Sequence, residues 1–219
     1  MTQAAAPLPP DEARTTPLIW AVLALICAPE LTLWAADMGW IGSPLWRPLS
    51  VQNGAFWPGL LRDWQPNYAA QPWTMFLSYA VLHISPWHLL GNALVLWWLG
   101  PQVIAYMGRR GFLITWTASA LLGGASFALL SKGTVPMVGA SGCVFGLMGA
   151  VVTYRYLLHN RLWTAAGMLG GIVLLHLLTL ALQQTGLAWQ PHLGGFVTGM
   201  GLALWSAGKL PPYPTASKN

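Results

Sequence analysis

Charged residues are scarce in this chain. Only 7% of its 219 residues are Asp, Glu, Lys or Arg, whereas 55% are hydrophobic, and the mean hydropathy is +0.53. Soluble domains carry about 25% charged residues. The composition therefore excludes a soluble domain with one core and favours a membrane protein. So short a chain also leaves no room for a separate soluble domain of ordinary size.

The chain contains only five acidic residues and two cysteines. No apolar segment contains an H-x-x-x-H or Glu/His pair, so we expect no metal site and no cofactor. Cys27 and Cys143 lie in different apolar segments and are more simply packing residues than a disulfide. Basic runs with interleaved aromatic residues are also lacking, so nucleic-acid binding is not predicted.

Long apolar segments are what the chain has instead. Six of them approach the length that crosses roughly 30 Å of hydrocarbon. They run near 18–36, 87–107, 111–130, 140–158, 162–182 and 191–208. Four of the five connections are short, which predicts a compact all-α bundle of six transmembrane helices, with one long connection over 37–85.

The flanks of this membrane domain, 18–208, are two tails. Residues 1–17 are rich in Ala, Pro and Thr and are predicted to be disordered, and 209–219 form a C-terminal tail. The apolar stretch after Arg14 contains Glu30, which favours a retained first helix over a cleaved signal peptide.

Basic residues predict the orientation. With the N-terminus in the cytoplasm, seven of the ten Lys and Arg residues lie on the cytoplasmic side and three outside, which places both tails in the cytoplasm. The inner set is Arg14, Arg109, Arg110, Arg155, Arg161, Lys209 and Lys218, and the outer set is Arg47, Arg62 and Lys132. The positive net charge is thus explained by topology and by attraction to anionic lipids.

Three polar residues fall at one predicted depth. At about 1.5 Å per residue from the nearest inner charge, Ser141 lies roughly 21 Å above the inner surface, and Asn92 and His192 roughly 25 Å. His88 lies one turn further out. Polar groups in hydrocarbon are expensive and usually functional. Irregular backbone at this depth needs protein or a water-filled cavity around it, so we expect a buried, wet site that opens to the outside.

A buried serine with a histidine is typical of a hydrolase. Ser141 follows Gly139 and Ala140 at a predicted helix start, where unpaired backbone N–H groups can stabilise an oxyanion. His192 is the candidate base. Asn92 and His88, four residues apart, share one helix face and can direct donors into the same space.

Each of these residues taken singly is more readily explained as structural. Ser141 could bond to its own backbone, and His192 could be a buried packing residue. His83 is interpreted as ordering the outer loop, His176 as a packing residue with a minor chance of a role near the site, and His159 as a turn residue.

Small residues predict which helices touch. Gly142, Gly146 and Ala150 recur every four residues, and so do Gly195, Gly199 and Ala203. Such stripes allow close helix approach. If they face one another, Ser141 and His192 lie at the same end of the contact. Generic helix packing explains the stripes about as well without the polar residues.

Three motifs in this order resemble the rhomboid family of intramembrane serine proteases. They are the run HISPWHLLGN from His83 to Asn92, the run Gly139-Ala140-Ser141-Gly142, and His192 followed by Gly195 and Gly199. The resemblance extends from about Gln71 to Gly208.

This resemblance implies a six-helix rhomboid-like bundle with a Ser141–His192 dyad and no acidic third member. The Ser141 backbone N–H, His88 and Asn92 would bind the oxyanion. The connection 183–190 would be a mobile cap, and 37–85 a membrane-lying loop. The implied partners are membrane protein substrates and the lipid bilayer. The short loops and the absence of targeting features favour a bacterial cytoplasmic membrane, with a eukaryotic organelle as the alternative. The sequence predicts no oligomeric state.

Three positions depart from the family pattern. Thr74 follows Trp73 where the family often has Arg, Ile104 stands where Glu is common, and Pro191 replaces a frequent Ala. The first two concern support of the outer loop and leave the dyad intact.

Other functions remain open at this point. One is a catalytically inactive rhomboid-like protein that binds membrane clients, against which the presence of Ser141 and His192 argues. A second is a transporter, although no internal repeat is found. A third is a metal hydrolase using His88, His176 and His192, for which acidic ligands are lacking.

Overall fold

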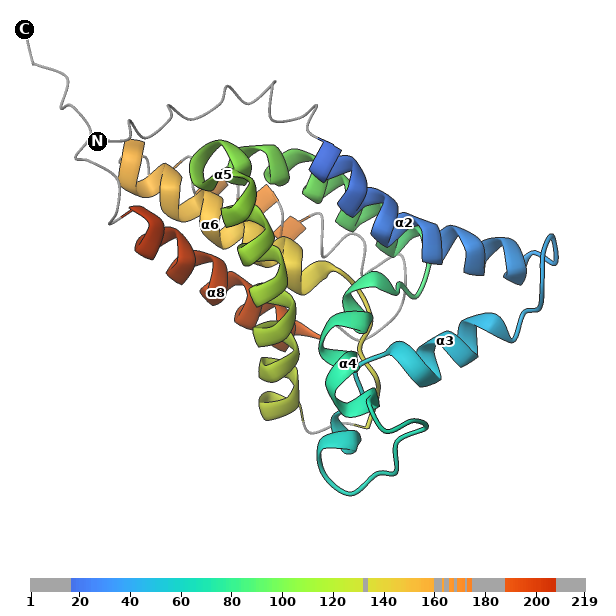
Figure 1. Cartoon of the computed structure of the whole chain (residues 1–219). Coiled ribbons are helices and arrows are strands. Elements are labelled where there is room, and N and C mark those ends of the chain that lie inside the picture. Colours follow the sequence, from blue (N-terminus) through green and yellow to red (C-terminus); the bar gives the residue numbers. More distant parts are fainter. Residues whose placement is uncertain are drawn as a thin grey trace, which may run out of the picture.

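The described part of the chain is helical in this computed structural model (Figure 1). The structure describes residues 17–131, 134–159, 163, 166, 167, 169–171, 173, 174 and 188–207. Within them the only β pairing is an isolated antiparallel bridge between Phe56 and Met137. Several predicted parts lie wholly or largely outside the described residues: the fifth segment (162–182) with His176, both tails, and most of the cap.

Among the described residues, two helices are long and apolar enough to cross a membrane: α2 (Pro17–Asp37) and α5 (Pro86–Leu130). α2 corresponds to the first predicted segment. It packs its buried face, which includes Ile19, against the first half of α5, where a Cβ on Gly100 would meet the Ile19 side chain.

α5 contains both the second and the third predicted segments. The backbone leaves the helical conformation at Gly108 (φ 71°, ψ 173°), and the chain turns sharply there (Figure 1). A positive φ of this kind favours glycine. The predicted connection over 108–110 is therefore in the right place, but it is a kink at one residue and not a loop.

The second half of α5 packs with two further helices, α6 (Ser141–His159) and α8 (Trp189–Ala207). α6 and α8 correspond to the fourth and sixth predicted segments. The start of α8 lies against the second half of α5, because a Cβ on Gly123 would contact the Pro191 carbonyl oxygen. This three-helix arrangement holds the candidate site.

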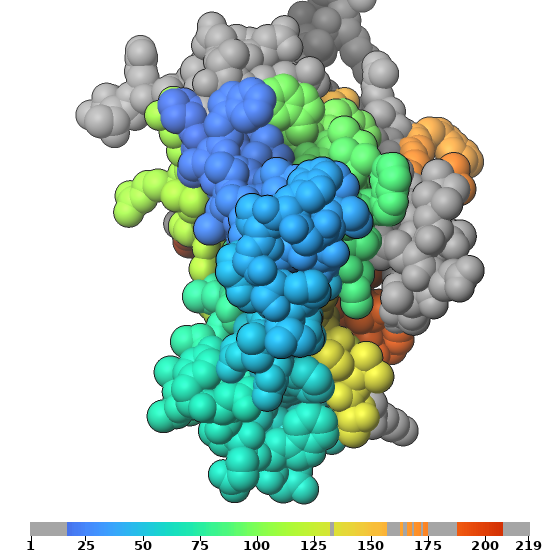
Figure 2. All heavy atoms as spheres, turned by 90° about the vertical axis from the view of Figure 1, so that its right-hand side faces the viewer, coloured from blue at the N-terminus to red at the C-terminus, as the bar shows by residue number. Residues whose placement is uncertain are grey.

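The long connection between α2 and α5 contains four short helices. They are α3 (Trp46–Gly54), η1 (Pro58–Leu61), α4 (Gln71–Ser78) and η2 (Tyr79–Val81). Figure 2 shows that α2 and this connection cover much of one face of the molecule. The Phe56–Met137 bridge ties the connection to the segment that precedes α6, with backbone N···O distances of 2.9 and 3.0 Å.

Candidate active site

Ser141 and His192 form a buried hydrogen-bonded pair. Ser141 is the first residue of α6, and His192 lies in the first turn of α8. The Ser141 Oγ is 2.9 Å from His192 Nε2, and the two residues are 6% and 8% exposed. The first turn of a helix has backbone N–H groups without intrahelical partners. The pair therefore joins a hydroxyl, an imidazole and a helix N-terminus in one place.

The glycines on α6 and α8 bring this pair together. A Cβ on Gly195 would overlap the Gly142 carbonyl oxygen, and a Cβ on Gly199 would overlap that of Gly146. The expectation that the two stripes face one another is confirmed. Backbone contact this close is possible only without side chains at Gly195 and Gly199.

An aromatic ring orients His192. The ring of Phe145 stacks on the imidazole with a centroid distance of 4.4 Å and an interplanar angle of 6°. Phe145 lies one turn after Ser141 on α6, so a single helix carries both the hydroxyl and the surface that fixes the histidine ring. Phe145 was not predicted from the sequence, although its four-residue spacing from Ser141 was a usable signal.

Asn92 lies on α5 and is 3% exposed. Its Nδ2 has no hydrogen-bond partner among the described residues. Buried side-chain donors are normally satisfied, because leaving one unpaired costs free energy. This amide donor is thus available to a group that enters the site.

His88 lies in the first turn of α5, which Ser85 caps by accepting a hydrogen bond from the His88 backbone N–H at 3.3 Å. The His88 ring lies directly over Gly139, where a Cβ would overlap it. Gly139 also has a φ of 127°, which L residues with side chains rarely adopt. Gly139 therefore serves both the close approach of His88 and the turn that leads into α6.

His83 is a neighbour of the site that sequence reasoning placed only in the outer loop. It is 1% exposed, its Nε2 accepts a hydrogen bond from the Ala140 N–H at 3.4 Å, and its ring meets that of His88 edge-on at 5.2 Å. Burial, and then the neighbouring His88, lower its pKa from 6.5 to about 3. His83 is therefore a neutral acceptor at physiological pH, and it touches the segments on both sides of the site.

The last residues before α6, from Met137 to Ala140, are covered by protein. The Gly139 N–H donates to the Tyr79 carbonyl oxygen at 2.8 Å, and the Tyr79 hydroxyl donates to the Ala120 carbonyl oxygen at 2.9 Å. The Gly139 bond and the Phe56–Met137 bridge satisfy irregular backbone just before α6, as was expected for such backbone inside a membrane.

The predicted residues thus divide into three groups. Contacts join Ser141 to His192, His88 to Gly139, Gly142 to Gly195, and Gly146 to Gly199. Asn92 is buried one turn after His88 on α5. His159 ends α6 and lies far along that helix from Ser141. His176 lies outside the described residues.

Comparison with known proteins places the chain in a family. Residues 69–208 match the Rhomboid domain family. The chain is 38% identical over 80 residues to the rhomboid protease GluP of Bacillus subtilis (strain 168), a match that covers 36% of this chain and 15% of that protein. It is 28% identical over 160 residues to the rhomboid protease GlpG of Yersinia pseudotuberculosis serotype I (strain IP32953), covering 72% of this chain and 54% of that protein. With GlpG of Yersinia pestis (strain Pestoides F) the identity is 31% over 103 residues, covering 47% and 34%. These matches span less than two thirds of each relative.

Proposed function

This chain belongs to the rhomboid family, and we propose on that basis that it is an intramembrane serine endopeptidase with Ser141 as nucleophile. The observation that carries the proposal is the 2.9 Å contact between Ser141 Oγ and His192 Nε2 at the start of α6. Its relatives GluP and GlpG are named rhomboid proteases. The substrates are transmembrane or membrane-associated proteins.

The proposed reaction follows the order of proton transfers in serine hydrolysis. His192 takes the proton of Ser141 Oγ as that oxygen attacks the peptide carbonyl. The protonated His192 then gives this proton to the leaving amine, which leaves an acyl-serine. Water attacks the acyl-serine, with His192 again accepting and returning a proton, and the free carboxyl product leaves Ser141 regenerated.

The oxyanion of each tetrahedral intermediate has three proposed donors: the backbone N–H of Ser141, the Nδ2 of Asn92 and the ring of His88. Donors prearranged in a site that excludes bulk water stabilise this charge strongly. The unpartnered Nδ2 of Asn92 supports this assignment. The five acidic residues of the chain all lie in 1–63, so no carboxylate neighbours Ser141 or His192 on α6 or α8.

We place the site in a six-helix membrane domain over 18–208, with both tails in the cytoplasm and the site open to the outer side of a bacterial cytoplasmic membrane. The apolar α2 and α5 support the membrane location. The split of basic residues supports the orientation.

The test is chemical labelling together with cleavage of a generic single-span substrate by the purified, reconstituted chain. A fluorophosphonate should label Ser141, and chelators should leave cleavage intact. Ser141→Ala and His192→Ala should each abolish cleavage. The matched control is Ser119→Ala, because Ser119 is also buried and its Oγ has no hydrogen-bond partner among the described residues. This control should keep both labelling and cleavage.

Three outcomes would count against the protease. Cleavage that survives Ser141→Ala would exclude the dyad, and cleavage lost only with chelator would favour a metal hydrolase. A folded chain that is neither labelled nor active on varied substrates would favour the inactive client-binding alternative.

A further inference from the structure

A buried carboxylate lies within the apolar helix α2. Glu30 is 0% exposed, and both of its oxygens accept hydrogen bonds from Arg47, Oε2 from Nη1 at 2.9 Å and Oε1 from Nη2 at 3.0 Å. This is the two-bond geometry that an Arg–carboxylate pair favours. A charge in a membrane helix is expensive and usually has a function, so the pair requires an explanation beyond chance burial.

Arg47 makes two further hydrogen bonds. Its Nε donates to Asp37 Oδ2 at 2.6 Å, and its Nη1 donates to the backbone carbonyl oxygen of His83 at 3.1 Å. One guanidinium thus connects three segments: α2, the start of α3 and the segment just before α5. A single ammonium group lacks the planar fork that reaches several acceptors at once.

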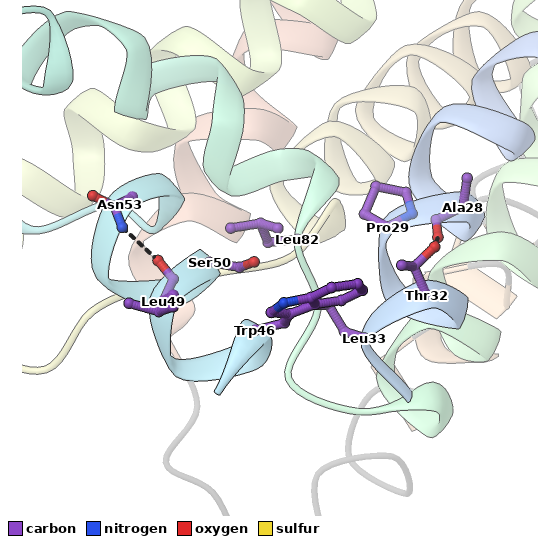
Figure 3. A pocket seen from close by; sticks show the side chains of 9 residues that line it. All are labelled: Ala28, Pro29, Thr32, Leu33, Trp46, Leu49, Ser50, Asn53 and Leu82. Atoms are coloured by element: carbon purple, nitrogen blue, oxygen red, sulfur yellow. Dashed lines mark hydrogen bonds between the residues drawn. The ribbon is translucent and has the colours of Figure 1, made fainter. Parts of the chain in front are cut away.

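Apolar packing between α2 and α3 is incomplete at this junction. A groove of about 620 Å³ opens between the two helices, with Pro29 and Leu33 of α2 on one side, Trp46 and Ser50 of α3 on the other, and Leu82 at its edge (Figure 3). Since Leu82 directly precedes His83, the groove lies beside the segment that Arg47 binds. The hydrogen bonds of Arg47 therefore set the position of the His83 segment at a junction where side-chain packing is incomplete.

The segment held by Arg47 leads directly to the candidate active site. The His83 ring accepts the Ala140 N–H and lies edge-on against His88. Ala140 precedes Ser141, whose backbone N–H is one proposed oxyanion donor, and the His88 ring is another. His83 therefore contacts the residue before one proposed donor and the ring of another.

We propose that Arg47, held by Glu30 and Asp37, is a positioning residue for peptide cleavage: it fixes the backbone of His83 and through it the oxyanion donors on both sides of the site. This inference rests on the proposed function. It assigns to the outer connection a role in the chemical step that is separate from holding the fold together.

The two roles can be separated because they respond to different substitutions. Removing one partner of a buried ion pair leaves an uncompensated charge and destabilises the protein, whereas replacing both by apolar residues is often neutral for stability. Loss of oxyanion positioning acts on the transition state, so it lowers kcat and leaves KM unchanged.

The experiment measures kcat, KM and the thermal unfolding midpoint of the full chain reconstituted with a single-span substrate. The double variant Glu30→Met/Arg47→Met should keep its unfolding midpoint and KM, and its kcat should fall on the order of 10- to 100-fold, as small displacements of reacting groups do. Arg47→Lys keeps a positive charge beside Glu30, so it is the second test variant if the double variant does not fold. Its kcat should also fall. Arg62→Met is the matched control, since Arg62 is an exposed arginine of the same connection, and its kcat should match wild type.

The outcomes separate this proposal from the proposed function. Wild-type cleavage that disappears in Ser141→Ala, combined with unchanged kcat in both Arg47 variants, would overturn the positioning role alone. A fall in kcat matched by an equal loss in the Arg62 control would also overturn it. Cleavage that persists in Ser141→Ala would overturn both proposals.

Discussion

The polar side chains of the site differ in whether they form hydrogen bonds within the folded protein. The Ser141 hydroxyl and the His192 ring bond to each other, and His83 accepts from the backbone of Ala140. The Nδ2 of Asn92 has no partner among the described residues. Truncating a side chain that bonds within the protein should lower stability. Truncating one that bonds only to substrate should lower activity alone, and the two effects can be measured separately.

Asn92→Ala should reduce activity without reducing stability. The substitution removes a donor that bonds nothing in the described structure, so the unfolding midpoint should stay near that of wild type. If Nδ2 binds the oxyanion, kcat should fall by at most about 10²- to 10³-fold, with the remaining donors limiting the loss. Parallel kinetics and thermal unfolding in one detergent measure both quantities.

The control for this substitution is Asn53→Ala. Asn53 is also an asparagine amide, but it lies on α3 and donates to the Leu49 carbonyl oxygen. Its loss should leave kcat unchanged. A large drop in the unfolding midpoint of Asn92→Ala would show instead that Nδ2 is satisfied within the folded protein.

His83 makes stability depend on pH. Its pKa is lowered from 6.5 to about 3 in the fold, first by burial and then by His88, so the unfolded chain binds the proton more readily. Stability contributed by neutral His83 is present above pH 6.5 and is lost as the pH falls toward 3. By pH 5 the loss should be on the order of 1–2 kcal/mol.

His83→Gln removes this titration and keeps a hydrogen-bonding side chain. Unfolding midpoints of wild type and variant at pH 7.5 and pH 5 should show a smaller acid loss in the variant. Equal losses in the two proteins would mean that His83 is not the residue responsible.

At the scale of elements, the helices that build the site were predictable because their signals are local. The helices α2, α5, α6 and α8 fall where the long apolar segments predicted them, and the two glycine stripes predicted the contact between α6 and α8. The break at 108–110 was also predicted, but its form was not, because a sharp kink at a single glycine and a short loop leave the same break in hydrophobicity.

The support of the site was not predictable in the same way. Arg47, Phe56, Tyr79 and His83 lie in the connection between α2 and α5, which has no single periodicity, and each acts through a contact with a distant part of the chain. The departures from the family pattern at Thr74 and Ile104 indicated that the outer loop is supported differently. They did not indicate that Arg47 supports it. Thr74 bonds to the Tyr68 hydroxyl, and Ile104 is buried in the core.

The α6–α8 contact should tolerate no side chain at its centre. Gly199→Leu should lower stability by about 1–3 kcal/mol or more, because the new side chain must displace the backbone of α6 near Gly146. Cleavage should fall as well, since the same contact sets the separation of Ser141 and His192. Unfolding midpoint and turnover are measured together.

Gly201→Leu provides a matched control on the same helix, because a Cβ at Gly201 would meet nothing within 4 Å. It should therefore behave like wild type in both measurements. If Gly199→Leu and Gly201→Leu are equally harmless, α6 and α8 meet through other faces.

For the whole molecule, the site depends on segments that are far apart in the chain but meet at one level. Ser141 is the first residue of α6, and His192 and His88 lie in the first turns of α8 and α5, so the N-terminal ends of three helices meet at the site. The common depth predicted for Ser141, Asn92 and His192 and the meeting of these helix ends depend on one condition. Both require that the three helices begin on the same side of the membrane.

The orientation of the whole molecule is the last prediction. Seven basic residues against three favour cytoplasmic N- and C-termini, so a reporter fused after Lys132 or within 45–65 should report an external location. A reporter at the C-terminus should report an internal one. Paired reporters that are active only outside, such as alkaline phosphatase, or only inside, such as green fluorescent protein, make each result independent of expression level. An external C-terminus would reverse the side from which α5, α6 and α8 enter the membrane, and the site would then open to the cytoplasm.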